Sequence, residues 1–168
     1  MGERLMPRDL DELYAHALVF EREATKRFAE LERYMRDAGM THVADEFESI
    51  GREEREQYEM LALGTAGREL PEVCGWEYPW HFLGPEAERV ETPTNAREAI
   101  AVALGTERRT QHFYGDVAEN ALDESVRAFA AEMAADEQRH VLRLELLLAR
   151  EPEAASSSEE DAGGARLA

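Results

Sequence analysis

Hydrophobic residues recur at spacings of three and four along most of this chain, and almost nowhere do they alternate with polar ones. This periodicity predicts four helices and indicates an all-α protein. Thr41 and Asp123 are candidate N-caps, Gly39 ends the first helix, and the fourth stops before Pro152. The predicted helices cover about residues 9–37, 41–64, 94–120 and 123–150.

The four helices divide into two pairs. Only a few residues join the helices within each pair, so each pair is expected to form an antiparallel hairpin. A long crossover, about residues 65–93, connects the pairs and contains four of the six prolines. This organisation predicts a four-helix bundle over residues 1–150 with one long crossover.

Two segments outside the helices have a distinct composition. The crossover contains Cys74 and a group of aromatic residues that we expect to pack against the bundle or a second subunit: Trp76, Tyr78, Trp80 and Phe82. Residues 151–168 are polar, acidic and of low complexity, which predicts a disordered tail.

Each helix has an apolar seam that is interrupted near its middle by one glutamate: Glu21, Glu54, Glu107 and Glu137. Since the seams of a bundle face its core, these four carboxylates should meet in one buried layer. Such a layer would be costly without compensating charge, and the seams carry no Arg or Lys. Two divalent metal ions would supply that charge. A mis-phased seam, side chains that reach the surface, or a buried Glu–Arg pair are the alternatives.

Spacing along the second and fourth helices supports metal binding. Glu137 and His140 are three residues apart, which places both on one helix face. Glu54 and Gln57 have the same spacing, with glutamine in the histidine position. The same arrangement therefore occurs in both hairpins. The first helix of each hairpin carries a single glutamate, and the second carries Glu-x-x-Gln or Glu-x-x-His.

Net charge restricts the class of partner. The 168 residues contain 19 Lys and Arg against 37 Asp and Glu, a formal charge of −18, which argues against nucleic acid and anionic membranes. No apolar run approaches the roughly 20 residues of a membrane span, and the start lacks the apolar core of a signal peptide. A single cysteine excludes internal disulfides. We therefore expect a cytoplasmic protein.

Four sequence blocks, in order, resemble a known family over roughly residues 9–150: EREATKRF (21–28), FESIGREEREQ (47–57), ERRTQHFY (107–114) and FAAEMAADEQRH (129–140). Together they resemble the rubrerythrin-like branch of the ferritin-like superfamily, whose members carry a di-iron carboxylate site. The fold implied is a ferritin-like four-helix bundle.

The resemblance assigns metal-ligand roles to five residues. Glu54 and Glu137 resemble the carboxylates that bridge two metal ions. Glu21 resembles the terminal ligand of the first ion and Glu107 that of the second, and His140 resembles the imidazole ligand of the second. Two iron ions are implied, with Mn or another divalent metal as the alternative.

This chain departs from the family pattern at two positions. Gln57 stands where the family has histidine, and an amide oxygen is a poorer ligand for Fe(II), so Gln57 is a weak ligand or lies just outside the ligand set. Thr110 stands where rubrerythrins often have another glutamate. The first metal position is therefore weakened, empty or suited to another metal. Tyr114 could hydrogen-bond near the site.

The resemblance implies a non-haem di-iron oxidoreductase that reduces hydrogen peroxide or dioxygen, as in protection against oxidative stress. A homodimer and a separate electron-donor protein are also implied. Two alternatives remain: a ferroxidase that handles iron, and a metal-poor bundle with a structural or interaction role. We expect the remaining potential ligands to be surface, packing or incidental residues: His16, His42, Cys74, His81 and His112.

Overall fold

The computed structural model describes residues 6–73 and 93–153, and in these segments the chain is helical with no strand. This confirms the all-α prediction. The helix boundaries agree closely with the periodicity: α1 (Leu10–Asp37), α2 (Thr41–Gly64), α3 (Ala96–Asn120) and α4 (Glu124–Arg150). The aromatic crossover residues and most of the predicted tail lie outside the described segments.

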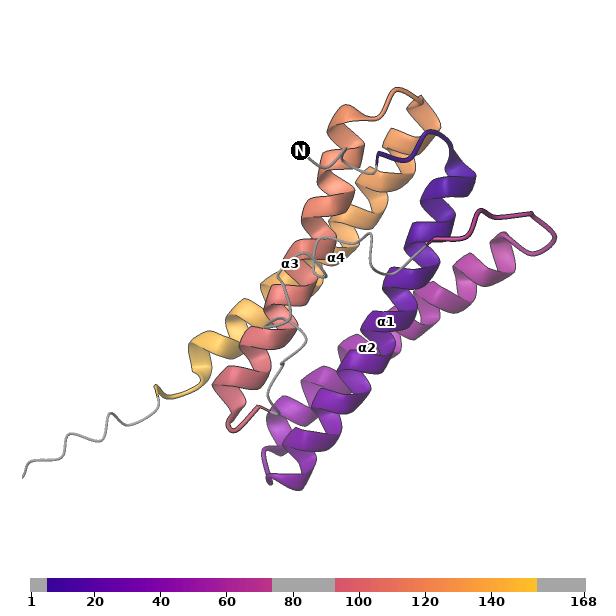
Figure 1. The fold of residues 1–168 in the computed structure, drawn as a ribbon. Helices are drawn as coiled ribbons and strands as arrows, with labels where there is room; N and C mark the ends of the chain where they lie inside the picture. Colours follow the sequence, from indigo (N-terminus) through magenta and orange to yellow (C-terminus); the bar gives the residue numbers. More distant parts are fainter. Residues whose placement is uncertain (1–5, 74–92, 154–168) are drawn as a thin grey trace, which may run out of the picture.

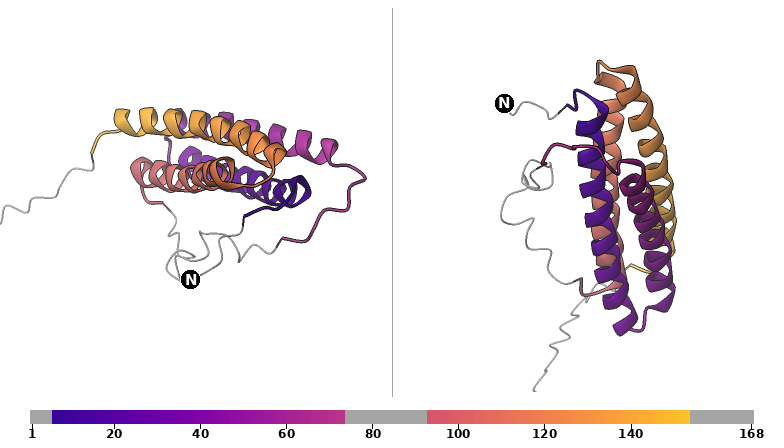
Figure 2. Two further views of the ribbon diagram at one scale, coloured as in Figure 1. Left: turned by 90° about the horizontal axis from the view of Figure 1, so that it is seen from above. Right: turned by 90° about the vertical axis from the view of Figure 1, so that its right-hand side faces the viewer.

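The helices form two hairpins that lie side by side, α1 with α2 and α3 with α4 (Figure 1). The views in Figure 2 show the four helix axes running roughly along one direction. Helix α1 packs against α3 and α4. Helices α2 and α4 run antiparallel, since Gln57 contacts Asp136 whereas Glu46 contacts Arg143. The chain is therefore a four-helix bundle, as predicted.

Side-chain caps begin three of the four helices. Asp9, Asn95 and Asp123 each accept hydrogen bonds from backbone N–H groups in the first turn of α1, α3 and α4. The prediction that Thr41 caps the second helix is wrong: Thr41 is its first helical residue, and Met40 occupies the cap position without a side-chain bond. The connection between α1 and α2 is so short that Met40 already accepts the first helical bonds of α2 through its carbonyl.

Two glycines allow α1 and α2 to approach closely. Gly39, in the connection between them, has a φ of 76°, a conformation that costs glycine little. Further along, a Cβ atom placed on Gly51 would lie 2.9 Å from the Cβ of Phe28. Two non-bonded carbon atoms do not approach this closely, so α1 and α2 can pack at their observed separation only because residue 51 has no side chain.

The apolar core consists of two clusters. One lies toward the α1–α2 connection and includes Phe28, Phe47, Ile100 and Leu144. The other lies toward the α3–α4 connection and includes Leu13, Phe20, Tyr114, Val117 and Val126. The helix segments between the clusters contain the four seam glutamates, so a polar layer crosses the middle of the bundle.

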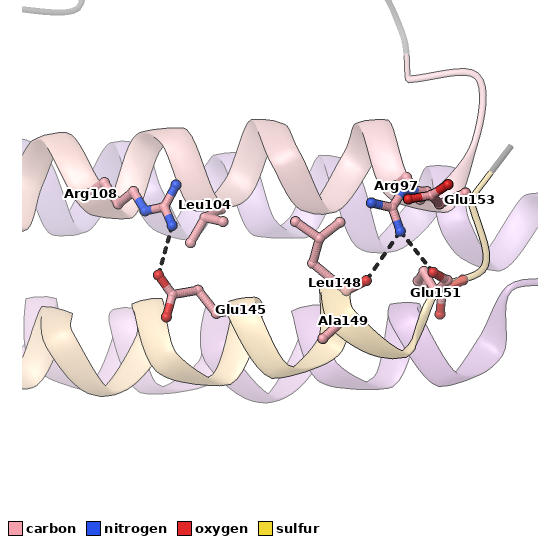
Figure 3. A pocket seen from close by; sticks show the side chains of 8 residues that line it. All are labelled: Arg97, Leu104, Arg108, Glu145, Leu148, Ala149, Glu151 and Glu153. Atoms are coloured by element: carbon pink, nitrogen blue, oxygen red, sulfur yellow. Dashed lines mark hydrogen bonds and ion pairs between the residues drawn. The ribbon is translucent and has the colours of Figure 1, made fainter.

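The packed bundle continues just beyond the end of α4. Glu151 is buried and contacts His42, while its backbone carbonyl accepts a hydrogen bond from Arg97 at 2.7 Å. Figure 3 shows this region, where an ion pair between Arg108 and Glu145 (2.7 Å) also joins α3 to α4. Arg97, Arg108, Glu145 and Glu151 are among the residues that line a surface hollow with a volume of about 450 Å³. Within it, Arg108 pairs with Glu145, and Arg97 donates to the backbone carbonyls of Leu148 and Glu151.

No helix in the described segments combines the length and the apolar character needed to cross a membrane.

Candidate metal centre

The four seam glutamates are buried in the middle of the bundle, one from each helix. The exposed fractions are 0% for Glu21, 1% for Glu54 and Glu107, and 2% for Glu137. The prediction that all four are internal is therefore confirmed, and side chains that reach the surface are excluded. In residues 6–73 and 93–153, no arginine or lysine forms an ion pair with any of them, which also removes the buried Glu–Arg alternative.

Four of the predicted residues form one compact group. Glu54, Glu107, Glu137 and His140 each place one potential ligand atom within 4.8 Å of the others. All four are buried and they come from α2, α3 and α4. Three carboxylates and an imidazole at this separation are a donor set that suits divalent transition metals.

His140 presents its two ring nitrogens to different surroundings. Nδ1 faces the buried layer, 2.6 Å from Glu54 Oε1 and 3.3 Å from Glu107 Oε2. Nε2 faces outward, 3.2 Å from Glu53 Oε2. Burial by itself would lower the pKa of His140, but with no metal bound the neighbouring carboxylates of Glu107 and Glu54 outweigh it and raise the pKa to about 10.

Many polar atoms in this layer have no well-formed hydrogen bond. Within the described residues these include both carboxylate oxygens of Glu54, one oxygen each of Glu21 and Glu107, and His140 Nδ1. Glu54 Oε1 and His140 Nδ1 thus lie 2.6 Å apart without the angles of a hydrogen bond, and both are potential metal-ligand atoms. Buried polar atoms are rarely left unpaired, and convergence on a common point is what ligands of a shared ion require. The residues therefore fit a bound metal.

Glu21 lies in the same layer but outside the compact group of four. Its Oε1 accepts a hydrogen bond from the Tyr114 hydroxyl at 3.4 Å. Burial, followed by the charges of Glu54 and Glu107, raises the pKa of Glu21 well above its ordinary value. Burial and the charge of Glu21 also raise the pKa of Tyr114, so the phenol keeps its proton and remains a donor. The expectation of a hydrogen bond from Tyr114 is confirmed.

The carboxylates of Glu107 and Glu137 are also difficult to ionise. Burial raises the pKa of both, and the negative charge of Glu54 raises each further. Repulsion of this kind is relieved by a cation placed among the carboxylates. The electrostatics of the layer therefore favour metal binding over a metal-free core.

Comparison with known proteins agrees with this geometry. A family model described as Rubrerythrin matches residues 12–148, which include α2, α3 and all but the outermost two residues of α1 and of α4. The chain belongs to the rubrerythrin family. A similar solved structure is that of an uncharacterized conserved protein from Magnetospirillum magnetotacticum MS-1, with a TM-score of 0.78 and 26% identity, covering 88% of this chain and 98% of that one. No curated protein matches the chain.

Two residues of this rubrerythrin-family chain that the sequence patterns did not indicate, Glu53 and Arg143, hold His140 from outside. Glu53 Oε1 accepts a hydrogen bond from Arg143 Nη1 at 2.6 Å, and Arg143 also donates to Glu46 (2.6 Å) and Ser49 (2.8 Å). Burial opposes the ionisation of Glu53, yet Arg143 and His140 lower its pKa below the ordinary value. Arg143 follows His140 by three residues on α4, a spacing that could have indicated this contact.

Gln57 does not belong to the compact group of acids and histidine, but it lies at the edge of the same layer. Its amide nitrogen donates to Asp136 Oδ2 at 3.1 Å, and its amide oxygen is buried with no hydrogen-bond partner among the described residues. Thr110, the other departure from the family pattern, is buried and donates to the carbonyl of Thr106 at 3.3 Å.

The remaining histidines of the described segments lie away from the layer. His16 is buried against the rings of Phe20 and Phe113, and His112 is exposed, as expected of packing and surface residues. His42 contacts Glu151 at the end of the bundle. His81 and Cys74 fall outside the described residues.

Proposed function

We propose that the buried layer binds two iron ions and that the protein is a non-haem di-iron oxidoreductase, which reduces hydrogen peroxide or dioxygen with electrons from a separate donor protein. The observation that carries this proposal is the convergence of four buried glutamates and His140 with most of their inward-facing atoms unpaired. Two divalent ions would balance the four carboxylate charges. Membership of the rubrerythrin family supports iron as the metal.

Five side chains would hold the ions. Glu54 lies centrally, since its negative charge contributes to the raised pKa of Glu21, of Glu107 and of Glu137. Glu21 would serve one ion, and Glu107 with His140 the other. Iron bound here would supply electrons for a two-electron reduction, in which peroxide takes up two electrons and two protons and leaves as two water molecules.

The chain's own contribution is to hold protons near this layer and to keep water out. The Tyr114 hydroxyl donates to Glu21 on one side. On the other, His140 contacts Glu53, whose side chain is 40% exposed, so these two residues connect the buried layer with solvent. The apolar clusters on either side exclude water elsewhere. With Nδ1 bound to a metal, the outer N–H of His140 would donate to Glu53, so we propose that Glu53 holds the ring in position and keeps a proton-accepting group at the solvent side of the layer.

An external electron donor follows from the cysteine content. The 168 residues contain one cysteine, so they cannot hold an iron bound by four cysteines as a second redox centre. We therefore propose that electrons reach the layer from another redox protein.

The test begins with metal content. Chelator-treated protein is loaded with Fe(II) without oxygen, freed of excess metal and analysed for its elements, alongside Glu54→Gln and the matched variant Glu59→Gln, in which an exposed glutamate of the same helix is changed. We expect two irons per chain in the wild type and in Glu59→Gln, and fewer in Glu54→Gln. Absence of bound iron, or equal loading of all three proteins, would contradict the proposal.

The second part of the test concerns the oxidant. Loaded, reduced protein is mixed with hydrogen peroxide or with dioxygen in a stopped-flow instrument, and oxidation of the iron is followed by absorbance. Peroxide should react faster. A faster reaction with dioxygen would instead favour the ferroxidase function.

A further inference from the structure

Two contacts on opposite sides of the buried layer have the same construction. Glu53 immediately precedes Glu54 on α2 and contacts His140 on α4, three residues beyond Glu137. Asp136 immediately precedes Glu137 on α4 and contacts Gln57 on α2, three residues beyond Glu54. Glu53 therefore contacts the outer side of His140, which lies one helical turn beyond Glu137 on α4. In the same way, Asp136 contacts the outer end of Gln57, which lies one helical turn beyond Glu54 on α2. Gln57 and His140 occupy corresponding places in the two halves of the layer.

Asp136 determines which way the Gln57 amide faces. One oxygen of Asp136 accepts from Arg139 at 2.7 Å and the other accepts from Gln57 Nε2 at 3.1 Å. A carboxylate in an ion pair has no hydrogen to donate, so only the NH₂ end of the amide can face it. The carbonyl oxygen of Gln57 must then point the other way, and it is buried there with no hydrogen-bond partner among the described residues.

The corresponding atom in the other half is His140 Nδ1. It too is buried and lacks a well-formed hydrogen bond, and it faces the carboxylates of Glu54 and Glu107. Two opposite side chains are thus each held at the outer end by an acid and each offer one unpaired atom inward. In one half that atom is a nitrogen, in the other an oxygen.

We propose that Gln57, positioned by Asp136, supplies an amide oxygen to a metal position shared with Glu21, so that one half of the centre offers oxygen donors alone. This inference rests on the proposed metal-binding function. Imidazole nitrogen suits Fe(II), whereas carboxylate and carbonyl oxygens suit harder ions such as Mn(II). The two positions therefore differ in affinity: the His140 half fills first with Fe(II), and the Gln57 half fills second and distinguishes Mn(II) from Fe(II) less.

The test measures each binding step separately. Metal-free protein is titrated with Mn(II), and with Fe(II) in the absence of oxygen, by calorimetry, while electron paramagnetic resonance reports whether bound Mn(II) ions are coupled in pairs. The variants are Gln57→Leu, Gln57→His and Asp136→Ala. Arg139→Gln is the matched control, because it removes the other partner of Asp136 and leaves the contact with Gln57. Circular dichroism checks that each variant folds.

The wild type should bind two ions in two unequal steps. Gln57→Leu should lose the weaker step and the coupled signal while keeping the stronger step, and Gln57→His should strengthen the weaker step for Fe(II). Asp136→Ala should weaken that step about 10- to 100-fold, the usual cost of removing a residue that orients a ligand. Arg139→Gln should leave both steps unchanged.

Two other results have distinct meanings. Two binding steps that do not respond to Gln57→Leu, Gln57→His or Asp136→Ala would overturn this inference and leave the proposed function standing. No binding of either metal to the wild type would overturn both. If Gln57→Leu fails to fold, Gln57→His and Asp136→Ala decide the matter by the same criteria.

Discussion

Raising the pH should destabilise the metal-free protein through His140. The pKa of this residue is about 10 in the folded protein against 6.5 for the free side chain, because the carboxylates of Glu107 and Glu54 outweigh its burial. A folded-state pKa above the unfolded one means that the folded protein holds the proton more tightly. The resulting stability is fully present below about pH 6.5 and is lost as the pH rises toward 10.

The size of the effect follows from that difference. A rise in the pKa of His140 from 6.5 to about 10 on folding contributes about 5 kcal/mol to the free energy of unfolding. This contribution is lost at about 1.4 kcal/mol for each pH unit between the two pKa values. The side chain of His140 is 1% exposed, so solvent screens its contacts little. Glu21 and Glu137 add to the loss in the same direction, since their raised pKa values also favour protonated groups in the folded state.

The assay is urea unfolding of chelator-treated protein at several pH values from about 6.5 to about 9. The wild type is compared with His140→Gln, which cannot take up the proton, and with His112→Gln, in which an exposed histidine is changed. Across this range the free energy of unfolding should fall by about 3 kcal/mol more in the wild type than in His140→Gln. His112→Gln should follow the wild type. Equal pH dependence in the wild type and His140→Gln would refute the reasoning.

Two further substitutions test the packing and the outer contacts of the layer. Gly51→Ala places a methyl group 2.9 Å from the Cβ of Phe28, and the overpacking cost of about 1–3 kcal/mol should exceed the roughly 1 kcal/mol gained in helix propensity. The Tm of Gly51→Ala, followed by circular dichroism, should fall. The control is Gly115→Ala, whose added methyl group meets nothing within 4 Å and whose Tm should rise. A higher Tm for Gly51→Ala would contradict this reasoning. Arg143→Gln removes the hydrogen bonds that hold the acid beside His140 and should lower metal affinity about 10- to 100-fold by calorimetry. Arg108→Gln, which breaks a surface ion pair, is the control, and equal affinities would be the contrary result.

Much of the fold could be predicted from local sequence because helix formation and amphipathicity are local properties. The spacing of apolar residues predicted all four helices, and the short connections predicted the two hairpins. The error at Thr41 concerns a helix terminus, where the tight connection after Gly39 outweighs the residue's preference for the cap position. Helical periodicity was also enough to place the four glutamates on the buried seams.

What a single helix cannot show is which residues of another helix it meets. That depends on the rotation and register of the two hairpins, which the packing of the whole core decides. The contact between Glu53 and His140 and the contact between Asp136 and Gln57 both cross from α2 to α4, more than 70 residues apart in the chain. Local sequence patterns are therefore enough to predict which helices form and which acids are buried. Helix packing sets which nitrogen of His140 faces the acids and which end of the Gln57 amide is buried, because those directions depend on partners that the opposite helix supplies.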